Sequence, residues 1–96
     1  MSANINIRFT VTGLADQHEA DLLFDRLDEL IRAEGLDDEL LLNMDEEGLD
    51  GITILADTNV PLIISKAYVY MPKVEQKVAA LIPPNATLEF HWEYAD

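Results

Sequence analysis

Polar and apolar side chains alternate over the first dozen residues. Ile5, Ile7, Phe9 and Val11 are separated from one another by asparagine, arginine and threonine residues. A period of two is typical of a β-strand that packs one face on the core and leaves the other face in water. Gly13 interrupts the pattern, so we expect the first strand to end there.

The period changes after Gly13 to that of a helix. Apolar residues recur at steps of three and four, at Ala20, Leu23, Phe24, Leu27, Leu30 and Ile31. Asp16 and Glu19 have the spacing of a capping box, in which both side chains accept hydrogen bonds from free amides at the helix start. Gly35 suits the left-handed position after a helix, and Leu36 can then fold back on the last turn. The pattern predicts a helix over 17–34.

A second alternating pattern covers 39–57. Its apolar positions are Leu40, Leu42 and Met44 in the first half and Ile52, Ile54 and Ala56 in the second half. Residues 47–51 between them have the composition of a turn. We therefore expect a β-hairpin with a strongly acidic loop.

Residues 58–82 allow two interpretations. Apolar residues at steps of three and four favour one long helix, but Pro72 would remove a hydrogen bond from its interior. We favour a helix that is kinked or broken near Met71. The alternative is a third hairpin-connected strand near 62–70, followed by a helix with Pro72 in its first turn. Residues 73–82 are helical in both interpretations.

The clearest strand pattern in the chain lies at 87–94. Its large apolar residues are Leu88, Phe90, Trp92 and Tyr94, and a polar residue separates each from the next. We expect all four to anchor the core, since each aromatic side chain can bury roughly 150–250 Å².

The predicted order is strand, helix, strand, strand, helix, strand. A sheet with one apolar face requires both helices to cover that face, and right-handed crossovers then connect the strands. We therefore expect an α+β fold, a ferredoxin-like split βαβ sandwich with a four-stranded antiparallel sheet and two helices on one face. The alternative interpretation adds a strand near 62–70. We expect residues 1–96 to form a single α+β domain.

Acidic residues are concentrated in one part of the chain. The 96 residues contain 19 acidic and 6 basic side chains, for a net charge of −13. Fifteen of the acidic residues lie between Asp16 and Asp57, where only Arg26 and Arg32 oppose them, so this segment carries the whole net charge. On the predicted helix we expect Arg32 to offset Asp28 and Glu29.

This charge distribution limits the kinds of partner that the protein can bind. Nucleic acids and anionic membranes are recognised through lysine and arginine, so we expect neither direct nucleic-acid binding nor membrane binding. The chain has no cysteine, no apolar run of roughly 20 residues and no signal-peptide pattern. We expect a cytoplasmic protein.

Motifs for catalysis or cofactor binding are missing from the sequence. There is no P-loop, G-x-G-x-x-G fingerprint or G-x-S-x-G elbow, and the two serines are not in a known catalytic spacing. His18 and His91 form no metal-binding pattern. We expect no catalytic residues, no cofactor and no metal site, and thus no enzymatic activity.

The acidic segment instead suggests a protein-binding function. We expect an inhibitor or immunity-type protein that occludes a basic, nucleic-acid-acting partner such as a nuclease or toxin. The predicted contact residues lie on the helix and the hairpin loop and are Asp21, Asp25, Asp28, Glu46, Glu47 and Asp50.

Two alternatives belong to other classes of protein. The first is a structural or regulatory subunit of a homo-oligomer, for instance a homodimer, which associates through an edge strand or through Tyr68, Tyr70 and Met71. The second is a small-ligand sensor or enzyme that uses carboxylates and His91. A domain of this size leaves little room for a pocket of roughly 300–1,000 Å³ unless subunits share it.

Overall fold

Five strands and two helices make up the fold of the described residues. The computed structural model describes residues 2–48 and 51–95. The elements are, in chain order, β1 (Ser2–Thr12), α1 (Gln17–Ala33), β2 (Leu40–Gly48), β3 (Gly51–Thr58), β4 (Leu62–Ser65), α2 (Ala67–Leu81) and β5 (Thr87–Tyr94).

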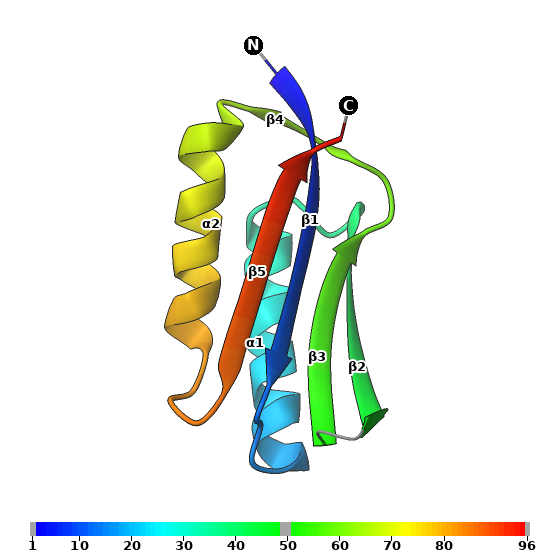
Figure 1. Cartoon of the computed structure of the whole chain (residues 1–96), viewed down its shortest axis with the longest axis vertical. Helices are drawn as coiled ribbons and strands as arrows, with labels where there is room; N and C mark the ends of the chain where they lie inside the picture. The colour runs from blue at the N-terminus through cyan, green and yellow to red at the C-terminus, as the bar shows by residue number, and fades with distance from the viewer. Residues whose placement is uncertain (1, 49–50, 96) are drawn as a thin grey trace.

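The strands form one antiparallel sheet with β1 at its centre. β5 pairs with one side of β1, while β3 and β4 pair with different stretches of the other side. β2 pairs with β3, so that β2 and β5 are the long edge strands, while the short β4 is paired with β1 alone. Both helices lie on the same face of the sheet (Figure 1). This is the predicted ferredoxin-like α+β arrangement. β4 pairs with β1 on the same side as β3, beyond the end of β3.

The core lies between the sheet and the two helices. Alternate residues of β1 are fully buried there, and α1 contributes one buried stripe. The buried residues of these two elements are Ile5, Ile7, Phe9, Val11, Ala20, Leu23, Leu27 and Ile31. They are the positions that the two periods predicted, because a strand repeats every second residue and a helix about every fourth.

Both ends of α1 have the predicted caps. The side chain of Asp16 accepts a hydrogen bond from the Glu19 amide at 2.8 Å, and Glu19 reaches back to the Ala15 amide at 3.1 Å. At the other end Gly35 has a φ of 72°, and the Leu36 amide donates to the carbonyl of Ile31 at 3.0 Å. This is the Schellman arrangement, which satisfies the carbonyls of the last turn.

The favoured interpretation of 58–82 was wrong, and the alternative is closer. A short strand, β4, precedes a single helix, α2, that runs through Pro72. Pro72 is the sixth residue of α2 and therefore lies beyond the first turn. Because proline has no N–H, the carbonyl of the exposed Tyr68 has no amide donor from the next turn of the helix. Met71 is fully buried, as is almost all of Val74 and Val78. This packing holds the helix together around the proline. Within the described residues, neither helix is long and apolar enough to span a bilayer.

The aromatic residues of β5 are less buried than predicted. Phe90 stacks on Phe9 with ring centroids 5.6 Å apart, and Trp92 contacts Tyr94 edge to face. However, Leu88, Phe90 and Trp92 are only half-buried, and Tyr94 is 52% exposed. β5 is an edge strand, so its side chains are covered from one side only.

An acidic flank as candidate functional site

One flank of α1 carries three of the predicted contact residues. Asp21, Asp25 and Asp28 follow one another at steps of four and three, about 120° around the helix from the buried stripe. Asp21 and Asp25 are exposed and Asp28 is half-exposed. With a rise of 1.5 Å per residue, the three carboxylates extend over about 10 Å of the helix.

The start of this flank lies beside β2. The side-chain amide of Gln17 donates to Asp21 at 2.8 Å and also contacts the sulfur of Met44 at 3.5 Å. Met44 is the middle residue of β2, the strand that leads into the hairpin turn. In Figure 1 the first turn of α1, the end of β2 and the start of β3 lie at the same end of the molecule. Asp21 is therefore close to the acidic hairpin.

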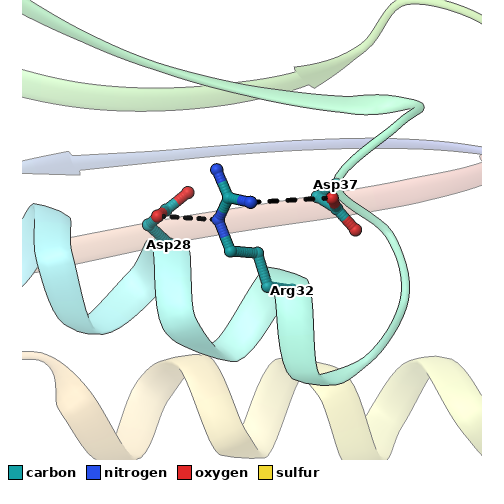
Figure 2. Close-up of polar contacts among 3 residues, drawn as sticks. All are labelled: Asp28, Arg32 and Asp37. Atoms are coloured by element: carbon teal, nitrogen blue, oxygen red, sulfur yellow. Dashed lines mark hydrogen bonds and ion pairs between the residues drawn. The ribbon is translucent and has the colours of Figure 1, made fainter.

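The other end of the flank is tied to the segment just before β2. Figure 2 shows Arg32 between Asp28 and Asp37, to which its guanidinium is joined at 3.0 and 3.9 Å. The hydrogen bond and the charge of Asp28, together with the charge of Asp37, raise the pKa of Arg32. The prediction that Arg32 offsets Asp28 is confirmed, but its second partner is Asp37 and not Glu29. Since both ends of the flank contact the β2 segment, the whole row runs along that edge of the sheet.

The hairpin residues of the predicted site are only partly described. Glu46 is exposed near the end of β2, two residues beyond Met44. The backbone of Glu47 belongs to β2, but its side chain lies outside the described structure, as does Asp50 entirely. We define the acidic flank as Asp21, Asp25, Asp28 and Glu46.

The flank has the chemistry of a contact surface. Its carboxylates are exposed and spread along the helix, and no group of three or more potential metal ligands occurs in the described residues. The Asp25 and Glu46 side chains make no hydrogen bond or ion pair within residues 2–48 and 51–95. Extended negative charge of this kind, which only Arg32 opposes among the described basic residues, suits a broad basic surface better than a single ion.

His91 lies far from this flank, on the sheet face that the helices leave open. There it lines a shallow hollow of about 590 Å³ together with Arg8, Asp57 and Glu93. Arg8 is paired in register with Asp57 on one side and with His91 on the other. His91 is exposed and makes no hydrogen bond with any residue that the structure describes. His18 lies on α1, on the opposite side of the sheet, so the two histidines do not converge.

Two residues that complete the flank were not anticipated from the sequence. Gln17 joins the helix to β2 across 27 positions of the chain, and Asp37 shares Arg32 with Asp28. Neither contact has a local signal, because side-chain pairs can be predicted from spacing only within one element.

Comparison with known proteins adds no functional information. No protein-family model matches the sequence, and neither a curated protein nor a solved structure is significantly similar to it. The chemistry of the chain's own surface is therefore the only guide to its function.

Proposed function

We propose that this protein binds a basic protein partner through the acidic flank. In this proposal it is an inhibitor of the immunity type, which occludes a nucleic-acid-acting enzyme such as a nuclease or toxin. The supporting observation is the continuous row of Asp21, Asp25 and Asp28 beside β2, which Arg32 alone neutralises among the described basic residues.

The row has the sign of charge that a nucleic-acid-binding surface recognises, with a wider spacing than that of phosphates. Steps of four and three residues separate the carboxylates by about 6 and 4.5 Å along the helix axis. Successive phosphates of one DNA strand are about 3.4 Å apart along the duplex axis. A surface of lysines and arginines that binds several phosphates over about 10 Å can also contact more than one carboxylate of the flank.

The localised charge supports fast association. Complementary fields raise association rate constants toward 10⁸–10⁹ M⁻¹s⁻¹ at low salt, roughly two or more orders above those of neutral partners. Fast capture matters for an inhibitor that must bind before its target degrades nucleic acid. We further propose that the protein acts in the cytoplasm, where such a target would do its damage.

The test is a kinetic binding measurement against purified basic nucleases and any toxin encoded beside this gene. Association should slow steeply as salt increases. Replacing Asp21, Asp25 and Asp28 together by asparagine should slow association at low salt by about tenfold or more, because the steering charge is lost.

A matched control removes the same charge elsewhere. Asp57, Glu75 and Glu93 are exposed and lie away from the flank, so the triple Asp57→Asn, Glu75→Gln, Glu93→Gln variant should bind almost like the unchanged protein. An equal decrease of the association rate in the two triple variants would show that only the net charge of the protein matters. An absence of binding to every basic protein tested at low salt would overturn the proposal.

A further inference from the structure

The strand β5 leaves one side of the sheet open along its whole length. It pairs with β1 at eight consecutive positions without a register shift, and no strand of the described chain pairs with its other side. The opposite edge is different, because β2 has a register shift between Asp45 and Gly48 and carries acidic residues. Bulges, prolines and charges are the usual means by which proteins protect an edge strand. β5 has no bulge in its pairing and no proline, and its charged residues, Glu89 and Glu93, point to the open face of the sheet and not along the edge.

The hydrogen bonding of β1 and β5 shows which backbone groups point outward. The Ala95 amide donates to the carbonyl of Asn4 at 2.8 Å, and the register places these two residues opposite each other. Since bonded and non-bonded pairs alternate in an antiparallel ladder, the odd-numbered residues of β5 bond to β1. The N–H and C=O groups that face the open edge therefore belong to Leu88, Phe90, Trp92 and Tyr94.

We propose that β5 pairs antiparallel with β5 of a second copy of this chain, which makes a continuous sheet across a homodimer. The charge distribution favours a second copy as the occupant. β5, α2 and β1 belong to the part of the chain with no net charge, whereas the −13 lies in residues 16–57. Pairing at β5 joins the two neutral sides and leaves β2, with its acidic flank, at the two far ends of the dimer (Figure 1).

The side chains and the length of the ladder together favour one register for this pairing. A pairing centred on Trp92 would also place His91 opposite a glutamate, Glu93 of the partner subunit, but it joins only residues 90–94 of β5, whereas a pairing centred on Phe90 joins residues 87–93. When Phe90 lies opposite Phe90 of the partner subunit, Glu89 lies opposite His91 of the partner subunit on the open face. A shift that centres the pairing on His91 would instead place Glu89 opposite Glu93 of the partner subunit, and like charges directly opposite are unfavourable. The Phe90-centred register also brings the half-buried Leu88 and Trp92 of the two copies side by side on the helix-covered face.

Two measurements on the full-length protein test the proposal, which does not depend on the function proposed above. Sedimentation equilibrium from low micromolar to millimolar concentration should show a monomer–dimer equilibrium. Amide hydrogen exchange should show protection that increases with concentration at Phe90 and Trp92, while Glu89 and His91 are protected throughout. A monomer at every concentration, or a dimer without this alternation, would overturn the proposal.

Charge variants at Glu89 and His91 test the register. Both residues are exposed, so the fold should tolerate substitutions there. His91→Glu places Glu89 opposite a glutamate in two symmetric places and should weaken dimerisation by about tenfold. Adding Glu89→Lys restores two opposite-charge pairs and should recover the dimer. Glu75→Lys, on α2, is the matched control and should have little effect. A dimer that responds equally to all three changes would contradict this register.

Discussion

Thr58 replaces a missing backbone partner in the centre of the sheet. The pairing of β1 changes from β3 to β4 near Ile7, a residue that is 1% exposed. At this junction the Ile7 amide donates to the Thr58 hydroxyl oxygen at 3.2 Å, and that hydroxyl donates to the side-chain oxygen of Asn6 at 3.2 Å. A buried amide without an acceptor is costly, so the hydroxyl makes the strand change possible.

We expect Thr58→Val to destabilise the fold by about 1–3 kcal/mol, because valine keeps the shape and leaves the Ile7 amide unpaired. Thr58→Ser keeps the hydroxyl and should cost clearly less. Urea unfolding of the three proteins measures the difference. Equal stability of the valine variant and the unchanged protein would show that water or a backbone group can replace the hydroxyl.

The structural role of Gly13 was predicted from the sequence only in part. Its position at the end of the first strand followed from the pattern, and its φ of 81° fits a turn glycine. A second constraint was not visible in the sequence: a Cβ at this position would lie 2.9 Å from the carbonyl oxygen of Asn85. The side-chain amide of Asn85 also donates hydrogen bonds to the Gly13 carbonyl and to the Glu19 carboxylate. Two turns that are 72 positions apart in the chain therefore meet here.

At the scale of elements, Glu34 connects the end of α1 to α2. Its carboxylate accepts hydrogen bonds from the Tyr70 hydroxyl at 3.1 Å and from the ammonium group of Lys77. The bond from Lys77 is the main reason that the pKa of Glu34 is lowered, and the bond from Tyr70 adds to it. Burial, followed by the charge of Glu34, raises the pKa of Tyr70 to about 12.

This contact predicts a loss of stability in alkaline solution. The folded protein holds the Tyr70 proton more tightly than the unfolded chain, whose tyrosines titrate near pH 10. The stabilisation is therefore complete below pH 10 and is lost as the pH increases toward 12. Tyr70→Phe should remove this part of the decline.

The measurement is the free energy of unfolding from pH 8 to pH 12 for both proteins. A decline of the same slope in the phenylalanine variant would contradict the assignment to Tyr70. The lowered pKa of Glu34 has the opposite sense, since its stabilisation is present above the ordinary pKa of glutamate and is lost as the pH falls through the lowered value.

The elements differ in how well local pattern predicted them. β1, α1, the hairpin and β5 have an uninterrupted period of two or of three to four, and all were predicted at nearly their observed positions. The segment before Pro72 has conflicting signals, with strand-favouring residues and a helical spacing. Burial of Met71, which depends on the sheet beneath it, decides in favour of a helix there.

For the molecule as a whole, the net charge lies on one side of the sheet, in residues 16–57. The acidic flank lies along β2, and the open edge of β5 lies on the other side (Figure 1). Repulsion among the carboxylates opposes folding, so we expect added salt to raise the free energy of unfolding.

Asp25 provides a sharper test of the same effect. It has acidic neighbours three or four residues away at Asp21, Asp28 and Glu29, and each like-charge pair costs about 0.2–0.5 kcal/mol. Asp25→Asn should therefore stabilise the protein by about 0.5–1 kcal/mol at low salt, with the gain disappearing at high salt. Urea unfolding at two salt concentrations measures it. A gain that persists at high salt would show a cause other than charge.

The sequence by itself determined the elements, the core faces and the row of carboxylates on α1. These features follow from periods of two and about four residues, and such periods relate only residues that are close together in the chain. Only the tertiary structure decided that this row lies along β2, that Thr58 bridges two strands and that Phe90 and Trp92 lie at an open edge. Each of these depends on which distant segments meet, and that is set by the packing of the whole chain, for which local spacing carries no signal.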